Sequence, residues 1–205
     1  MKNIITIQHT QSIHHTNGMV GSQTDWALTE LGINQAKHIG EKLITELSGK
    51  KLSRKKLKMY SSDLLRARQT AEYVGGYLGL TPVLRSELRE RNLGKCCGKS
   101  IQWLRDNIEC HEKTVDDRMF SDAESRRDEW NRLKPFFDEI MSNDEDYIII
   151  VSHGDLLSVF TIMFLGLDVE VLNAYEMQGA AGGVSLFIEN EGKRIVKRFS
   201  DMSYL

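Results

Sequence analysis

The sequence predicts an α/β fold in three layers (α/β/α), with a mostly parallel, mixed sheet flanked by helices. Short apolar runs typical of buried strands alternate along the chain with longer segments of helical periodicity, which favours parallel strands joined by helices. Two further apolar runs near the C-terminus are separated by a short turn, which predicts an antiparallel pair added to the sheet. A chain of 205 residues suits a single domain covering residues 1–205.

Buried strands are predicted where short apolar runs lie between polar or glycine-containing segments. The most apolar of these runs is YIIIVSHG, which leads directly into a predicted helix. The runs VSLFIE and RIVKRFS are joined by the turn NEGK, and we expect them to pair as antiparallel neighbours. In chain order, the predicted strands cover residues 3–8, 57–62, 147–154, 184–189 and 194–200.

Helices are predicted where apolar side chains recur every three or four residues, as at Ala36, Ile39 and Leu43. Thr29 is placed to cap the first helix, because its hydroxyl can accept a hydrogen bond from a free amide of the first turn. Ser62 is expected to cap the second helix in the same way. The predicted helices cover residues 30–49, 63–79, about 122–141, and 155–166.

Charge and cysteine content exclude several classes of protein. A formal net charge of −2 implies no general attraction to nucleic acid or to an anionic membrane. The basic run KKLSRKKLK, residues 50–58, lacks an aromatic platform for bases and is interpreted as a solvated helix end and loop. No signal peptide or membrane span is recognised, and the three cysteines do not make a disulfide framework. We therefore expect a cytoplasmic protein.

Polar side chains follow three predicted strands. His9, Ser62 and His153 lie at or just beyond their carboxyl ends, which meet at one edge of a parallel sheet, where such folds bind ligands. Arg66 lies early in the next helix, where its guanidinium and the free amides of the first turn can bind an anion. A neutral imidazole is a nucleophile toward phosphorus, so this combination predicts phosphate chemistry, which also needs an acid for the leaving group.

Five segments, in order along the chain, carry a specific family resemblance. The first, QHTQSIHHTNGMVGSQTDWALTELG, aligns without a gap with a family motif that opens Arg-His-Gly-Glu-Thr. The others are SSDLLRARQTAEYV, LRERNLGKCCG, DAESRRDEWNRLKPFFDEI and IIIVSHGD. By these segments, the chain resembles the histidine phosphatase superfamily, with its phosphoglycerate mutase-like fold, over essentially its whole length.

The resemblance implies a role for each of several residues. It identifies His9 as the residue that is phosphorylated and Glu90 as the proton donor. It assigns His153 and Arg66 to clamping the phosphoryl group, with Gly154 beside them at the substrate. The expected activity is hydrolysis of a small phosphorylated substrate, with no metal or other cofactor and with no nucleic-acid or membrane partner.

The first motif departs from the family pattern at four positions. Gln8 stands where the family has an arginine that grips the phosphoryl group, and His15 stands where it has an asparagine. Thr10 and Gln11 replace the glycine and the glutamate of the motif. Glutamine brings no charge, and a charge-assisted hydrogen bond is about twice as strong as a neutral one. The change at position 8 is therefore expected to lower the rate of phosphoryl transfer.

Two interpretations of these departures stay open. In the first, His15 compensates as an imidazolium, which predicts an activity optimum on the acid side. In the second, the site has lost activity and binds a phosphorylated ligand without turnover. Because His9, Arg66, Glu90 and His153 are all present, the active enzyme is favoured.

Hydrolysis is favoured over phosphomutase activity. The segment from Glu90 to His153 is short compared with the glycolytic mutases of the family, where a longer insertion closes over the substrate and excludes water. Residues from about 95 to 121 are expected to form a flap over the site. Its candidate substrate contacts are Trp103, Arg105, His111 and Arg118. The identity of the substrate, and the choice between a monomer and a homodimer, stay open.

Three further groups have simpler interpretations. Asp155 is a second candidate acid, but a side chain turned toward the N-terminus of its own helix is favoured. His14 is expected to point away from the site if its loop is extended. A metal site formed by His9, His14 and His15 is disfavoured by the adjacent pair, and one formed by the cysteines and His111 lacks C-x-x-C spacing.

Overall fold

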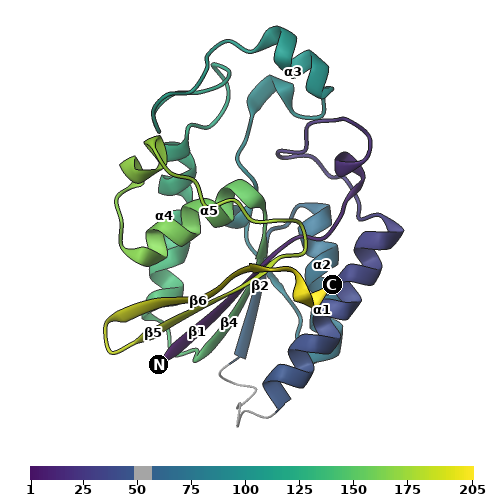
Figure 1. Cartoon of the computed structure of the whole chain (residues 1–205), viewed down its shortest axis with the longest axis vertical. Helices are drawn as coiled ribbons and strands as arrows, with labels where there is room; N and C mark the ends of the chain where they lie inside the picture. Colours follow the sequence, from purple (N-terminus) through teal and green to yellow (C-terminus); the bar gives the residue numbers. More distant parts are fainter. Residues whose placement is uncertain (49–56) are drawn as a thin grey trace.

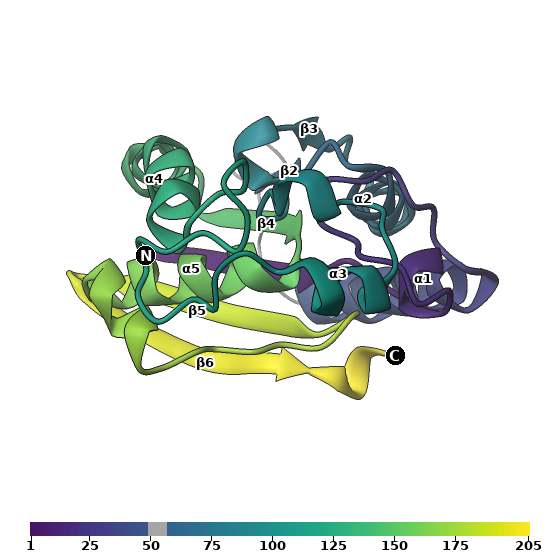
Figure 2. The same cartoon turned by 90° about the horizontal axis from the view of Figure 1, so that it is seen from above.

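Six strands form one mixed sheet, in the order β3-β2-β4-β1-β5-β6, in the computed structural model, which describes residues 1–48 and 57–205 (Figure 1). β1 to β4 are parallel, whereas β5 is antiparallel to β1 and β6 to β5. Figure 2 shows the β5–β6 pair at one edge of the sheet and β3 at the other. The strands are β1 (Lys2–Gln8), β2 (Leu57–Ser61), β3 (Val83–Leu84), β4 (Tyr147–Ser152), β5 (Val184–Asn190) and β6 (Lys193–Asp201). The predicted mixed sheet is confirmed.

Helices cover both faces of this sheet. α1 and α2 pack on one face and α4 and α5 on the other, while α3 lies beyond one end of the sheet (Figures 1 and 2). The helices are α1 (Glu30–Ser48), α2 (Leu65–Leu78), α3 (Ile101–Asn107), α4 (Arg126–Ser142) and α5 (Gly154–Leu165). The three-layer α/β/α arrangement is therefore confirmed.

Alternate side chains of the same strand supply two apolar cores, because successive residues of a strand point to opposite faces. Ile148 and Ile150 of β4 are fully buried in a cluster with Phe160 of α5. Ile149, between them, is fully buried on the opposite face in a cluster with Val74 of α2. The two cores hold β1, β2 and β4 between the helical layers, with their carboxyl ends at one edge.

Helix caps explain where the observed helices begin. Thr29 Oγ1 accepts a hydrogen bond from Gly32 N over 3.0 Å at the start of α1, as the sequence predicted. The helix expected from about residue 122 begins instead at Arg126, because Ser125 and Asp128 form a capping box. The short elements α3 and β3 were not predicted, since neither is long enough to show a clear apolar period.

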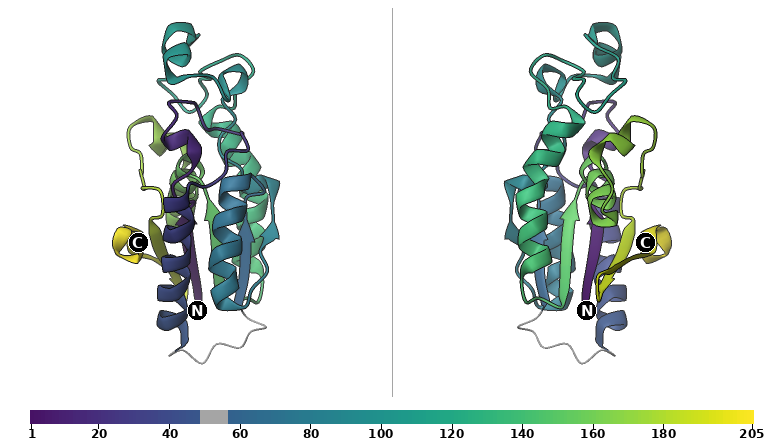
Figure 3. Two further views of the ribbon diagram at one scale, coloured as in Figure 1. Left: turned by 90° about the vertical axis from the view of Figure 1, so that its right-hand side faces the viewer. Right: turned by 90° about the vertical axis from the view of Figure 1, so that its left-hand side faces the viewer.

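Residues 95–121, the predicted flap, form α3 and its flanking loops beyond the carboxyl ends of β1, β2 and β4 (Figure 3). Cys96 and Phe120 are fully buried in a small apolar cluster of this segment, and the Trp103 ring lies 5.9 Å from the Phe120 ring. Trp103 therefore packs within the segment, while Arg105 and His111 are exposed. A lid function for the segment stays a prediction.

The basic run of residues 50–58 falls mostly outside the described residues, which resume at Leu57 in β2. Its interpretation as a solvated loop therefore stays a prediction. Among the residues that the structure describes, no helix combines the length and the hydropathy needed to span a bilayer.

Candidate active site

Two histidines lie side by side at the carboxyl ends of β1 and β4. The parallel register pairs Gln8, the last residue of β1, with Ser152, the last residue of β4, and His9 and His153 follow directly. Their ring centroids are 5.1 Å apart in an edge-to-face arrangement. The sheet therefore brings together two predicted site residues that lie far apart in the sequence.

His9 is held as a neutral imidazole with a defined tautomer. Its ring is buried, and Nδ1 lies 2.8 Å from the carbonyl oxygen of Thr10, to which it donates a hydrogen bond. The proton therefore sits on Nδ1, and Nε2 keeps its lone pair. Burial, and then the cation of Arg66, hold the pKa of His9 well below its usual value. This is the protonation state that a nucleophile needs.

Arg66 comes from the first turn of α2 and contacts His9 directly. Its Nε donates a hydrogen bond to His9 Nε2 over 3.1 Å. Nη1 donates to the carbonyl of Thr24 and Nη2 to the carbonyl of Ser22, each over 2.7 Å. Burial lowers the pKa of this guanidinium to about 10, so it is still a cation at neutral pH. Two carbonyls thus fix a positive charge beside the His9 ring.

His153 is the N-cap residue of α5 and is fully buried. Its Nε2 lies 2.9 Å from Ser62 Oγ, whereas Nδ1 has no hydrogen-bond partner among the described residues. The prediction that Ser62 is the N-cap of α2 was wrong, because Leu64 holds that position; Ser62 Oγ accepts a hydrogen bond from Leu64 N over 3.2 Å and also faces His153. Burial is the main reason that the pKa of His153 lies well below its usual value.

Glu90 is the carboxyl group predicted as the proton donor. Its Oε1 accepts hydrogen bonds from the backbone amides of Arg91, over 3.1 Å, and of Leu156 in α5, over 3.3 Å. Burial, reinforced by the neighbouring Asp155, raises the pKa of Glu90 to about 7 against the opposing effect of Arg66. A carboxyl group with this pKa is protonated often enough at neutral pH to serve as a general acid.

Hydrogen bonds from Arg132 of α4 hold the loop that carries Glu90. Arg132 donates from Nη1 to the carbonyls of Glu87, over 2.8 Å, and Arg89, over 3.0 Å. The same guanidinium pairs with Glu124, with Nε 2.8 Å from Oε1. Glu124 and Arg132 both belong to the segment DAESRRDEWNRLKPFFDEI, which thus supports the loop of Glu90.

Beside Glu90 lies a group of charged residues of which the sequence had singled out only Asp155, as a second candidate acid. Asp155 Oδ2 is 3.4 Å from Arg91 Nε and 3.3 Å from Arg126 Nη1. Arg126 Nη1 also lies 3.3 Å from Oε2 of Glu129, which is fully buried. Burial, and then Asp155, raise the pKa of Glu129 to about 8. Nothing in the sequence marks Arg126 and Glu129, because charged side chains on a helix are usually solvated.

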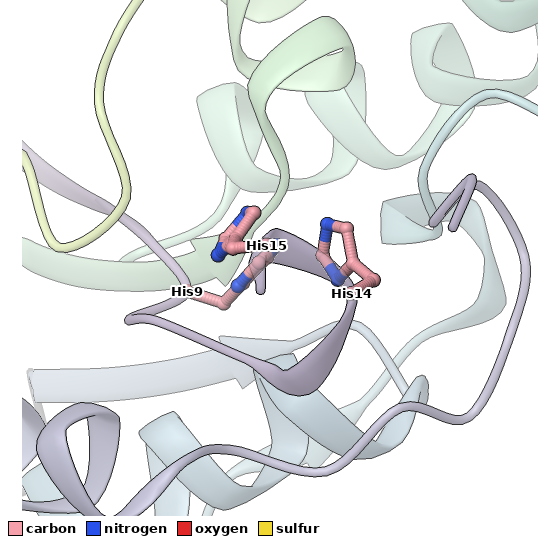
Figure 4. Close-up of side chains that lie close together, drawn as sticks. All are labelled: His9, His14 and His15. Atoms are coloured by element: carbon pink, nitrogen blue, oxygen red, sulfur yellow. The ribbon is translucent and has the colours of Figure 1, made fainter. Parts of the chain in front are cut away.

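His14 and His15 also lie over His9 (Figure 4). The expectation that His14 points elsewhere was wrong, because residues Ile13–His15 form a 3-10 turn (η1) rather than an extended loop. The ring of His15 stacks on that of His9, with centroids 5.4 Å apart and planes at 11°, and the His14 ring lies 5.7 Å from that of His9. The turn thus adds two imidazoles to the site.

The three rings approach each other closely enough to raise the question of a metal site. One ring nitrogen of each residue, His9, His14 and His15, lies within 4.8 Å of the others. A metal needs a free lone pair from each ring, but Nε2 of His9 accepts a hydrogen bond from Arg66, and Nδ1 of His15 accepts one from Ser12 N over 3.2 Å. The fixed guanidinium also repels a cation, so the arrangement suits an anion better.

Comparison with known protein families shows which family this chain belongs to. The sequence profile of the histidine phosphatase superfamily (branch 1) matches residues 4–201. The chain belongs to the histidine phosphatase superfamily. The match covers all three strand ends that form the site, and the phosphoglycerate mutase-like resemblance noted in the sequence is confirmed.

Individual relatives within the superfamily include phosphatases and phosphoglycerate mutase-like proteins. The chain is 26% identical over 203 residues to "Putative phosphoserine phosphatase 2" of Hydrogenobacter thermophilus, with 96% of this chain and 94% of the relative covered. It is 28% identical over 176 residues to a "Probable phosphoglycerate mutase" of Erwinia tasmaniensis, with coverage of 82% and 76%. A mycobacterial glucosyl-3-phosphoglycerate phosphatase structure superposes with a TM-score of 0.81 at 22% identity, covering 98% and 99%, which shows the shared fold.

Gln8, the last residue of β1, fits between two glycines. A Cβ atom added at Gly154 would lie 3.3 Å from Gln8 Nε2, and one added at Gly179 would lie 3.0 Å from Gln8 Oε1. Gly154, predicted as a substrate contact, thus begins α5 directly beside the Gln8 amide. The loop around Gly179 was not selected from the sequence, since a glycine gives no sign of which side chain it approaches.

Proposed function

We propose that the chain hydrolyses phosphomonoesters without a metal ion, through a phosphohistidine formed on His9. The observation that carries this proposal is the hydrogen bond of 2.8 Å between His9 Nδ1 and the Thr10 carbonyl, which leaves Nε2 as the nucleophilic nitrogen. Membership of the histidine phosphatase superfamily and the phosphatases among the relatives support it.

In the first step, the lone pair of His9 Nε2 attacks phosphorus, so that a P–N bond forms and the P–O bond to the leaving group breaks. Glu90 gives its proton to the leaving oxygen and becomes a carboxylate, and an alcohol departs. Arg66 and His153, both in contact range of His9, stabilise the charge on the phosphoryl oxygens.

In the second step, Glu90 takes a proton from water as the water oxygen attacks phosphorus. The P–N bond breaks, and its electron pair returns to Nε2. The products are inorganic phosphate and neutral His9, with Glu90 protonated again. The mechanism needs a group that acts first as an acid and then as a base, and a carboxyl group with a pKa of about 7 meets both requirements at neutral pH.

We infer that the acceptor is water rather than a second substrate. The segment between Glu90 and His153 is short for a phosphomutase of this family, and a less covered site admits water. The substrate class is a small phosphorylated molecule, as the phosphatase names among the relatives suggest. The three cysteines are free, which suits a reducing, cytoplasmic setting.

Hydrolysis of an aryl phosphate in the presence of a chelator, from mildly acid to neutral pH, tests the proposal. We expect turnover that is lost in His9→Ala and retained in His38→Ala, which alters an exposed histidine on α1. An inactive native chain would contradict the proposal. A requirement for a bisphosphate primer would assign a mutase. An anion that stabilises the fold without turnover, together with activity in Gln8→Arg, would assign a binding protein.

A further inference from the structure

Four imidazoles surround one guanidinium at the carboxyl end of the sheet. His14 and His15 come from η1, His9 from the end of β1, His153 from the start of α5, and Arg66 from α2. The rings of His14 and His15 have their centroids 4.0 Å apart, and both face His9 (Figure 4). Burial lowers the pKa of Arg66, while Glu90, in the loop after the 3-10 turn Ser86–Leu88, and Asp25 raise it.

These four rings and Arg66 form what we call the histidine cup. While the rings are neutral, Arg66 is its one positive charge, which is little for binding a phosphoryl dianion. Nε, Nη1 and Nη2 of Arg66 each already donate one hydrogen bond to His9 or to a backbone carbonyl. Nδ1 of His15 accepts from Ser12 N, so the neutral ring carries its proton on Nε2. Nδ1 of His14 lies 2.7 Å from Ser12 Oγ, which can accept a hydrogen bond from a protonated ring. Gln8 contributes no charge.

An anion bound in the histidine cup would raise the pKa values of His14 and His15, which are low in the free protein. Burial and Arg66 lower the pKa of His15, and burial, His15 and Arg66 lower that of His14 to about 3, so both rings are neutral in the free protein at neutral pH. A dianion beside them favours the protonated form. A proton taken up by the pair turns a ring nitrogen into a charged donor.

We propose that His14 and His15 bind the phosphoryl group, and that binding of the anion draws one proton from solvent onto this histidine pair. The proposal rests on the proposed function only in placing the anion at His9. The pair supplies, when the anion is present, the positive charge that Gln8 does not. In the free protein it is uncharged, which helps to leave the nucleophile unprotonated.

Calorimetric titration with sulfate tests the proposal. Sulfate is a tetrahedral dianion that does not titrate near neutral pH, so any proton taken up on binding belongs to the protein. Titrations in buffers of different ionisation enthalpy measure that uptake. We expect about one proton per sulfate, with an affinity that rises about tenfold for each unit by which the pH falls in the range where uptake is complete.

Variants assign the proton to a residue. The double variant His14→Gln, His15→Asn should lose both the uptake and the pH dependence, whereas His38→Asn should keep both. Glu90→Gln should also keep the uptake, and this variant is needed because the pKa of Glu90, about 7, makes it the main competitor. Native-like uptake in the double variant, its loss in Glu90→Gln, or failure of the native chain to bind sulfate would each overturn the proposal.

Two further readouts separate the possible failures. NMR of the histidine rings in the native chain, with and without sulfate, should show protonation of His14 or His15, and it does not depend on a variant folding. An unchanged pair of ring signals would contradict the proposal. A chain that hydrolyses aryl phosphate through His9 but binds sulfate without proton uptake keeps the proposed function and loses this inference. A chain that takes up a proton on binding sulfate but hydrolyses no aryl phosphate keeps this inference and loses the proposed function.

Discussion

Nε of Arg66 donates a hydrogen bond over 3.1 Å to Nε2 of His9, the nitrogen proposed to attack phosphorus. The two terminal nitrogens of the same guanidinium are held by the carbonyls of Ser22 and Thr24, each over 2.7 Å. The group is therefore fixed before any anion arrives, and only its Nε has to exchange His9 for a phosphoryl oxygen. Such preorganised donors contribute much of the stabilisation of a transition state.

Arg66→Lys tests this preorganisation. Lysine keeps the charge but lacks the planar fork that spans His9 and two carbonyls, so we expect kcat/KM for an aryl phosphate to fall about 10²–10³-fold. Arg68→Lys is the matched control, because Arg68 lies on the same helix and pairs loosely with Glu72, 3.8 Å away at the surface. Equal activity in the two variants would show that the fork at Arg66 is not needed.

Glu90→Gln tests the general acid. Only the protonated carboxyl can donate a proton, so with a pKa of about 7 the rate of the native chain on an alkyl phosphate should fall as the pH rises above neutral. Glutamine cannot donate, and we expect the rate of the first step, measured as the burst of released alcohol, to fall about 10²–10⁴-fold with alkyl phosphates and much less with aryl phosphates, with no such alkaline limb. Equal losses of this first-step rate with both leaving groups would argue for a structural role instead.

Much of this arrangement could be predicted because parallel strands end at one edge of a sheet. His9, His153 and Arg66 were selected for that reason, and the register of β1 and β4 places the two histidines together. The role of Ser62 could not be predicted in the same way. Its sequence position suits a helix cap, and only the fold shows that Leu64 takes that place and that the Ser62 hydroxyl, which accepts from Leu64 N, also contacts His153.

The other features of the site that the sequence did not predict have a common physical cause. An adjacent pair such as His14 and His15 diverges in an extended loop and converges in a 3-10 turn, and local sequence does not decide between the two. Arg126 and Glu129 lie on a helix whose composition is typical of a solvated surface. Their burial depends on how α4 packs against the loop of Glu90, and that is set by contacts far apart in the chain.

Ser62→Ala should destabilise the fold and impair the site together. His153 Nε2 would lose its partner at 2.9 Å, while Nδ1 already lacks one in the described parts of the chain, so a buried ring would be left unsatisfied. Such a loss costs about 1–3 kcal/mol, or several °C in Tm, and thermal unfolding measures it. Ser61→Ala, which removes a buried hydroxyl bonded to the Ser62 carbonyl, is the control and should leave kcat near native. Native kcat in Ser62→Ala would show that this bond does not position His153.

Glu129→Gln should stabilise the protein at alkaline pH. The pKa of Glu129 is about 8 in the folded chain, against its usual 4.5, so its contribution is favourable below about pH 4.5 and is lost as the pH rises through 8. Glutamine stays neutral throughout, and Arg126 keeps Asp155 at 3.3 Å and Glu176 at 2.8 Å as partners. Thermal unfolding should therefore give similar Tm values for variant and native chain near about pH 5 and a Tm several °C higher for the variant near about pH 9.

Glu139→Gln is the matched control for this prediction, since Glu139 lies on the same helix, is exposed and pairs with Arg85 at the surface. It should show no comparable gain at alkaline pH, because an exposed carboxylate is solvated in the folded and unfolded chain alike. A Glu129→Gln variant that is less stable than the native chain near about pH 9 would contradict the argument. It would mean that the buried carboxylate is ionised and that its attraction to Arg126 outweighs the cost of burying the charge.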